Sequence, residues 1–67
     1  MSKLFETVQR IEAVIAQRDL PIFVTKGKIA IKTGFPLGLI TARTPDDPVV
    51  LQKLRAAARD VLGEGIW

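Results

Sequence analysis

Apolar residues recur with the period of a helix in the first quarter of the chain. The stripe is formed by Leu4, Val8, Ile11 and Ile15, which follow one another at intervals of four, three and four positions. This spacing places all four side chains on one face of an amphipathic α-helix. Ser2 stands at the N-cap position, where its hydroxyl can accept a hydrogen bond from a free backbone N–H. The pattern predicts a helix over about residues 3–17.

Two further apolar residues of this helix fall beside the stripe. At about 100° per residue, Phe5 lies to one side of it and Val14 to the other. One flat packing surface does not easily cover both side chains. We therefore expect either that this helix sits between two layers or that one flank contacts a second chain.

Three short runs in the middle of the chain predict β-strands. Residues 22–25 are rich in β-branched and aromatic side chains, and residues 28–33 begin with alternating polar and apolar positions. Lys26-Gly27 separates these runs and has the length of a two-residue hairpin turn. Residues 39–43 have a similar composition. The middle of the chain therefore predicts an antiparallel sheet of two or three strands.

The register of the predicted hairpin has two alternatives. With a two-residue turn, Val24 faces Ile29 and Ile22 faces Ile31, so these four side chains share one sheet face. A turn with a glycine bulge shifts the register by one and places Phe23 opposite Ile29. We favour the first register.

The last third of the chain predicts a second helix over about residues 48–62. Asp47 is expected at the N-cap and Pro48 at the first helical position, because both residue types are preferred there. Gly63 is the expected stop, followed by a short tail up to residue 67. The apolar centre of this helix is formed by Val50, Leu54, Ala57 and Val61.

Together these elements predict one small α+β domain with both helices packed on one face of a short antiparallel sheet. A chain of 67 residues forms at most one domain, and its core is small. The chain contains no Cys and no His, which excludes disulfides and the usual ligands of structural zinc. Hydrophobic residues nevertheless make up 48% of it. Self-association or docking on a partner is the remaining way to add stability.

The sequence carries no recognisable catalytic or cofactor-binding motif. Nucleophilic catalysis usually needs a base such as His, and none is present. Asp46-Asp47 is the only adjacent pair of acids, and carboxylates can bind hard cations. The neighbouring prolines favour the other interpretation, in which these acids start a helix. We expect no enzymatic activity, cofactor, bound metal or small-molecule substrate.

Basic residues suggest nucleic acid as one possible partner. The formal net charge is +3, and the chain has no acid between residues 20 and 45. Lysines of a hairpin and arginines one turn apart on a helix can follow a phosphate backbone. Binding of this kind would be weak and largely independent of sequence. The candidate nucleic-acid contacts are Lys26, Lys28, Lys32, Arg43, Arg55 and Arg59.

Large apolar residues also occur where a loop and a tail are expected. Phe35 and Leu37 lie in a Gly- and Pro-containing loop, and Trp67 is the last residue of the sequence. Such side chains are typical anchors of interfaces. The candidate interface residues are Phe5, Val14, Phe35, Leu37 and Trp67.

The resulting hypothesis is a small non-enzymatic interaction module, an adaptor or regulator, that forms a homodimer or binds another protein. Weak nucleic-acid binding through the basic hairpin is the alternative. No apolar run approaches the ~18 residues that a membrane span needs, and charges near the start argue against a signal peptide. We therefore expect a cytoplasmic protein without a membrane partner.

Overall fold

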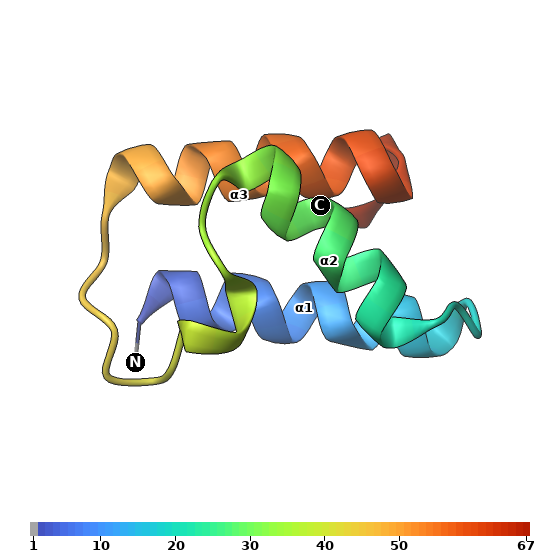
Figure 1. Cartoon of the computed structure of the whole chain (residues 1–67), viewed down its shortest axis with the longest axis horizontal. Coiled ribbons are helices and arrows are strands. Elements are labelled where there is room, and N and C mark those ends of the chain that lie inside the picture. Colours follow the sequence, from blue (N-terminus) through green and yellow to red (C-terminus); the bar gives the residue numbers. More distant parts are fainter. Residues whose placement is uncertain (1) are drawn as a thin grey trace.

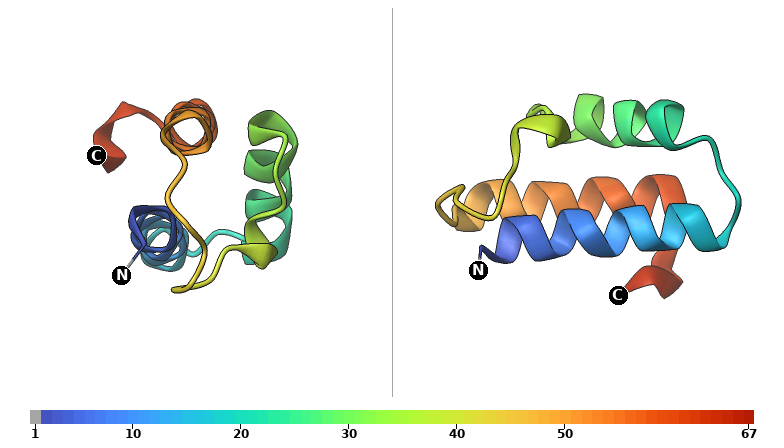
Figure 2. Two further views of the ribbon diagram at one scale, coloured as in Figure 1. Left: turned by 90° about the vertical axis from the view of Figure 1, so that its left-hand side faces the viewer. Right: turned by 90° about the horizontal axis from the view of Figure 1, so that it is seen from below.

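The structure is a computed structural model that describes residues 2–67, and every regular element in that range is a helix. In chain order the elements are α1 (Lys3–Gln17), α2 (Ile22–Thr33), the short 3-10 helix η1 (Leu37–Leu39), α3 (Pro48–Leu62) and the short 3-10 helix η2 (Glu64–Ile66). Figure 1 shows α1 and α3 side by side along the molecule, with α2 crossing in front of them. The two views of Figure 2 place α2 on one side of this pair and η2 on the other.

The first helix lies over the range that its apolar stripe predicts. The Ser2 hydroxyl accepts a hydrogen bond from the backbone N–H of Phe5 at 3.3 Å, as expected of an N-cap. The helix ends before Asp19, whose backbone is left-handed with φ 54°. Pro21 follows two residues later, and a proline disfavours the helical conformation in the residue before it.

The last α-helix also begins where its start signals lie. The Asp47 carboxylate accepts from the backbone N–H groups of Val49 at 2.9 Å and Val50 at 3.3 Å. Pro48 occupies the first helical position, where its missing N–H costs nothing. Gly63, with φ 94°, follows the last turn in a conformation that disfavours other residues.

The predicted α+β fold is wrong, because residues 22–33 form a continuous helix where a hairpin was expected. The buried residues of α2 are Thr25, Ile29 and Thr33, at intervals of four. Two of these three are threonines, so the buried stripe is not visible as a period of apolar residues. The Thr33 hydroxyl donates to the carbonyl oxygen of Ile29 at 2.7 Å, which satisfies it inside the helix.

Gly27 also favoured the wrong prediction of a hairpin. In the expected hairpin it completed the turn, whereas in the structure it lies in the interior of α2. The glycine that ends this helix is Gly34, which has φ 76° and a backbone N–H bonded to the Ala30 carbonyl at 2.8 Å. Tertiary packing of Ile29 overrides the strand preference of the β-branched residues around it.

The prediction of a third strand over residues 39–43 is wrong as well. Leu39 ends η1, and the following residues form a turn in which the Thr44 N–H donates to the Thr41 carbonyl at 3.0 Å. The Thr44 hydroxyl in turn accepts from the Thr41 N–H at 2.8 Å. These local hydrogen bonds satisfy backbone groups that would pair with a neighbouring strand if residues 39–43 formed a strand.

The core lies where the three α-helices meet. α1 and α3 supply most of it, α2 contributes Ile29, and η1 and η2 close its edges with Leu37 and Ile66. Its fully buried large side chains are Leu4, Ile11, Ile15, Ile29, Leu54 and Ile66. Within the described residues, none of the helices has the length and apolar character needed to cross a membrane.

Candidate functional site

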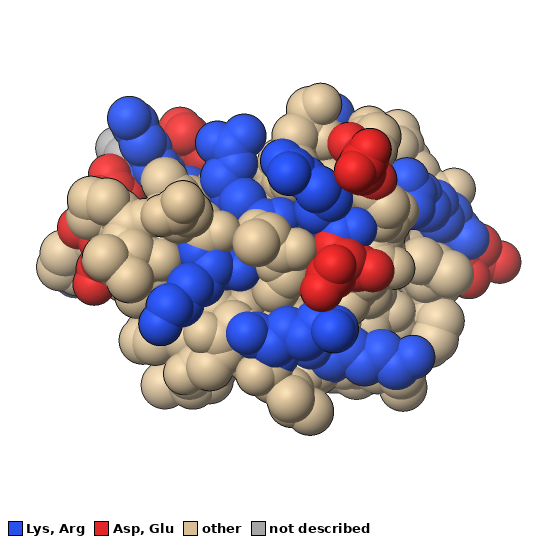
Figure 3. Space-filling model, turned by 90° about the horizontal axis from the view of Figure 1, so that it is seen from above, with Lys and Arg blue, Asp and Glu red and all other residues tan. Residues whose placement is uncertain are grey.

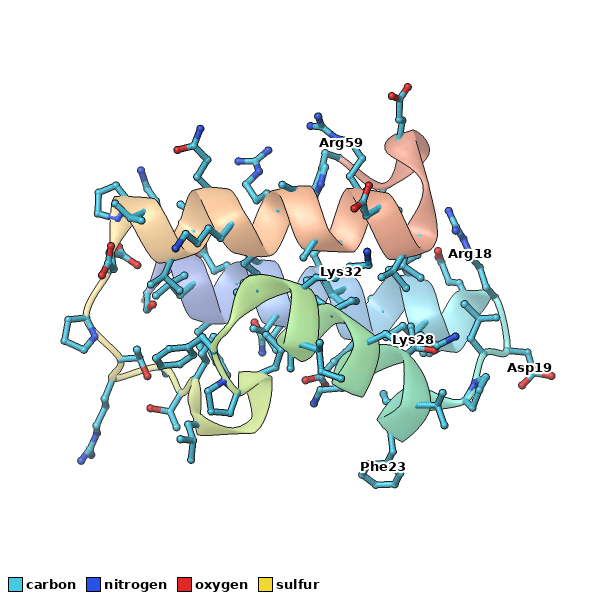
Figure 4. The ribbon with its side chains drawn as sticks, turned by 45° about the horizontal axis from the view of Figure 1, so that its top comes forward. Arg18, Asp19, Phe23, Lys28, Lys32 and Arg59 are labelled. Atoms are coloured by element: carbon cyan, nitrogen blue, oxygen red, sulfur yellow. The ribbon has the colours of Figure 1, made fainter. Side chains whose placement is uncertain are left out.

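Helix α2 turns most of its large apolar side chains outward. Its inner face buries Ile29 between Thr25 and Thr33. On the outer face, Phe23 is 87% exposed and Ile31 is 82% exposed. Figure 4 shows Phe23 pointing away from the body of the molecule. An amphipathic helix of a monomeric protein normally has the opposite arrangement, with apolar residues inside and polar residues outside.

Gly27 lies at the middle of this outer face. It is four positions after Phe23 and four before Ile31, so the three residues lie along one side of the helix. A Cβ atom placed on Gly27 would meet no other atom within 4 Å. Nothing inside the chain therefore requires glycine at this position.

A shallow apolar groove runs beside Gly27. Its volume is about 310 Å³, and it separates α2 from the residues around η1. Leu39 of η1 is 68% exposed and extends the apolar surface beyond the helix. The groove is lined by Phe23, Lys26, Gly27, Ala30, Pro36, Leu37 and Gly38. We call the surface formed by Phe23, Val24, Gly27, Ala30, Ile31 and Leu39, together with this groove, the α2 face.

Lysines flank the α2 face, and two of them are paired within the chain. The Lys26 ammonium lies 3.2 Å from the carboxylate of Glu12 on α1. The Lys32 ammonium lies 3.5 Å from the carboxylate of Asp60 on α3. Both pairs are partly or largely exposed and contribute little to stability. The α2 face therefore has an apolar centre bordered by lysines, two of which are already paired with acids of α1 and α3.

The structure divides the six candidate nucleic-acid contacts among separate places. Lys28 and Lys32 lie on the side of α2 that faces α3, and Arg59 projects from α3 (Figure 4). Lys26 lies at the α1 side with Glu12, and Arg43 lies in the loop before α3. Figure 3 shows basic side chains gathered over α2 and α3, with acidic side chains among them. The expected basic hairpin does not exist, because its two strands are one helix.

Arg55 is held near the end of the chain. Its guanidinium carbon lies 5.0 Å above the centre of the Trp67 ring. The Trp67 indole N–H donates to the Arg55 carbonyl oxygen at 3.2 Å. These contacts fix the last residues against α3 and give Trp67 a role within the chain.

The candidate interface residues contribute less exposed surface than the α2 face does. Val14 and Leu37 are buried in the core. Phe5, Phe35 and Trp67 are partly buried and pack against it. The residues that do expose large apolar surface were not among the candidate interface residues predicted from the sequence. Their signal was the spacing of Phe23, Gly27 and Ile31 at intervals of four, which becomes informative once residues 22–33 are interpreted as a helix.

Asp46 and Asp47, considered above as a metal-binding pair, both cap helices. Asp47 caps α3, and one oxygen of Asp46 accepts from the Ser2 hydroxyl and from the backbone N–H groups of Lys3 and Leu4. Among the described residues, no three potential ligand side chains lie together in a way that would hold a metal ion. The arrangement of these two acids supports helix starts.

Comparison of the chain with models of protein families, with curated proteins and with solved structures finds no match. The interpretation of the α2 face therefore depends on its own burial, charge and shape.

Proposed function

We propose that this protein is a non-enzymatic interaction module that self-associates through the α2 face. The observation that carries the proposal is the inverted arrangement of α2. Phe23 and Ile31 are 87% and 82% exposed, while the inner face of the same helix buries two threonines beside Ile29. A helix with its largest apolar side chains in water gains free energy when a second surface covers them.

The exposed area is appropriate for a weak dimer. The α2 face presents on the order of 500 Å² of apolar side-chain surface, which lies within the roughly 300–600 Å² of the largest apolar patch on a typical monomer, and such patches are often functional. A stable dimer buries about 800 Å² on each partner. Fully burying a Phe or Ile side chain contributes roughly 1.5–3 kcal/mol, and two copies would bury two of each. Association itself costs about 4–15 kcal/mol, so the net affinity is expected in the micromolar range.

Sedimentation equilibrium of the unmodified chain tests the proposal directly. We expect a species of twice 7.4 kDa at micromolar concentration. The double variant Phe23→Gln, Ile31→Gln should shift the equilibrium toward monomer by at least roughly tenfold, because each lost apolar contact at an interface centre is worth more than about 1 kcal/mol.

Val49→Gln is the matched control. Val49 is 59% exposed, but it lies in the first turn of α3 and outside the α2 face. Its replacement should leave the dimer unchanged. A folded monomer at several hundred micromolar, or equal effects of the Val49 and α2 variants, would contradict the proposal.

Nucleic-acid binding is a second candidate function, supported by the basic side chains gathered over α2 and α3 in Figure 3. Its contacts would now be Lys28, Lys32 and Arg59, which lie on neighbouring helices (Figure 4). Binding should weaken with salt, since each neutralised phosphate contributes about −0.9 to the slope of log affinity against log salt on duplex DNA.

A mobility shift with generic duplex DNA tests this candidate. Lys28→Gln with Lys32→Gln should abolish the shift, and Arg43→Gln in the distant loop is the control. Equal binding by the double variant and the unmodified chain would rule out this surface.

A further inference from the structure

The glycine at the centre of the α2 face has no role inside one chain. Glycine in a helix interior costs roughly 0.5–1 kcal/mol relative to alanine. Gly27 has open space around the position of a Cβ, so alanine would fit without a clash. Its lack of a side chain matters only for something that approaches from outside. Small residues at helix crossings let two backbones come close together.

The other residues of the α2 face are arranged symmetrically about Gly27. Val24 and Ala30 stand three positions before and after it, and Phe23 and Ile31 stand four positions before and after it. At about 100° per residue, Phe23 and Ala30 fall on one side of Gly27, and Val24 and Ile31 fall on the other. The groove confirms this division, because it is lined by Phe23 and Ala30 and by neither of the other two.

We infer that two copies of this chain pack α2 against α2 in antiparallel orientation, with a two-fold axis passing at Gly27. The inference rests on the proposed self-association and specifies its geometry. The two Gly27 residues meet at the crossing point. Phe23 of the second copy then comes level with Ala30, on the side of the groove, and Val24 of the second copy comes level with Ile31.

Steric balance favours this orientation over a parallel one. In the antiparallel pair, each half of the contact contains one Phe23, one Val24, one Ala30 and one Ile31. The two helices can then stay at an even distance along their length. A parallel pair would gather both phenylalanines and both valines at one end and leave both alanines and both isoleucines at the other, so the bulkier first end would hold the helices farther apart. Uneven contacts of this kind leave voids that cost packing energy.

The groove also accommodates the aromatic ring in this orientation. Its far end is formed by Ala30 together with Pro36, Leu37 and Gly38. Phe23 of the second copy lies at this level and on this side. A volume of about 310 Å³ for the whole groove leaves room for one aromatic ring beside the resident Phe23. The ring would cover Leu37 and the backbone of Gly38.

The helix termini supply an independent argument. The N-terminus of α2 has no side-chain cap and no acidic residue in its first turn. Its partial positive charge is therefore not balanced by a side chain of its own first turn. Antiparallel packing brings the C-terminal end of the second α2 toward it, where the carbonyl groups carry partial negative charge and Lys32 of the last turn is paired with Asp60. Parallel packing would bring two such positive ends together.

Cysteine cross-linking tests the orientation without interference, because the chain has no cysteine of its own. A disulfide needs Cα atoms within about 7 Å. In the antiparallel pair, Ile31→Cys alone should not link to itself, because its two copies would be about 12 Å apart along the helices. A mixture of Val24→Cys with Ile31→Cys should form the mixed dimer.

The products are measured by intact-mass spectrometry after mild oxidation, since the Val24 and Ile31 variants differ in mass. Val49→Cys, outside the α2 face, gives the background from random collisions. The mixed dimer should exceed that background by roughly tenfold or more, because association raises the effective concentration of the two thiols.

Each outcome has a distinct meaning. Mixed Val24–Ile31 product without self-linked Ile31→Cys supports the inference. Self-linked Ile31→Cys without mixed product indicates parallel packing, which overturns the inference and leaves self-association intact. A dimer in sedimentation with neither mixed Val24–Ile31 product nor self-linked Ile31→Cys above background places the interface elsewhere and also overturns it. A monomer without any links contradicts the proposed function as well.

Discussion

The carboxylate of Asp46 accepts a hydrogen bond from the hydroxyl of Ser2 at 3.0 Å, across 44 positions of sequence. The same oxygen accepts from the backbone N–H of Lys3 at 2.7 Å and of Leu4 at 3.2 Å. α1 is therefore capped twice, by Ser2 from its own start and by Asp46 from the loop before α3. These bonds attach that loop to the N-terminal end of α1 and fix where α3 begins relative to it.

The first prediction concerns pH. Desolvation raises the pKa of Asp46, but hydrogen bonds from Leu4, Ser2 and Lys3, together with the charge of Lys3, outweigh it and hold the pKa below its ordinary value. A carboxyl with a lowered pKa in the folded state stabilises that state above its unfolded pKa, and this contribution disappears as the pH falls through the folded pKa. Asp46→Asn should therefore lower the melting temperature near neutral pH and match the unmodified chain in strong acid.

Thermal melts followed by circular dichroism between neutral pH and about pH 2 measure this effect. Asp19→Asn is the control, because asparagine tolerates the left-handed backbone of Asp19 and the structure describes no side-chain hydrogen bond of that residue. A constant difference between the Asp46 variant and the unmodified chain over the whole pH range would show that Asp46 does not act through its charge.

The second prediction compares two isoleucines of α2 that are two positions apart. Ile29 is fully buried, whereas Ile31 is 82% exposed. Ile29→Ala should lower the free energy of unfolding by about 2–5 kcal/mol, since it leaves a cavity in the core. Ile31→Ala should leave the monomer unchanged or slightly more stable, because alanine has the higher helix propensity.

Urea unfolding at concentrations too low for self-association measures both values. In the expected hairpin, the two isoleucines would lie on the same sheet face and respond alike. A similar loss of stability in both variants would therefore contradict the helical register of α2.

The sequence is sufficient to predict α1 and α3 because several local signals agree there. The apolar stripe, the N-cap and the C-terminal glycine of each helix indicate the same boundaries, as Ser2 and Asp47 illustrate. In α2 the signals conflict. β-branched residues favour a strand, Gly27 resembles a turn, and the inner face carries threonines at positions where apolar residues would mark the helix.

The candidate site could not be predicted for the same reason. In a hairpin, Phe23 and Ile31 fall on opposite faces of the sheet, and no continuous apolar surface arises. In a helix they share one face with Gly27. The cap formed by Asp46 on α1 was also missed, because contacts between residues 44 positions apart leave no periodic signal in a single sequence.

The third prediction concerns salt. The flanks of the α2 face carry lysines, and in the antiparallel pair Lys28 of one copy lies on the same edge as Lys28 of the other. Their repulsion opposes association and is screened as salt is added, because the Debye length falls from about 10 Å at 0.1 M to about 3 Å at 1 M. Self-association should therefore become stronger with salt.

Sedimentation at low and high salt, with Lys28→Gln as the comparison, measures this dependence. The Lys28 variant should associate more strongly at low salt and respond less to salt addition. Dissociation of the dimer by salt would indicate instead that opposite charges hold it together. Binding of nucleic acid must respond in the opposite direction, so the same titration separates the two candidate functions.

The last prediction separates the stability of one chain from the affinity between two. Gly27→Ala adds a methyl group where no atom lies within 4 Å and improves helix propensity. The monomer should gain about 0.5–1 kcal/mol. The same methyl group lies at the proposed crossing point, where it would separate the two helices and weaken the dimer several-fold.

Ala56→Gly is the mirror-image control. Ala56 lies in the middle of α3, exposed to solvent and outside the α2 face. Its replacement by glycine should lower the stability of the monomer by a similar amount and leave the dissociation constant of the dimer unchanged. Unfolding at low concentration gives the first quantity, and sedimentation equilibrium gives the second. If Gly27→Ala strengthened both folding and association, Gly27 would have no part in the contact. If it stabilised the monomer and weakened the dimer, Gly27 would strengthen the contact with the second chain while lowering the stability of its own helix.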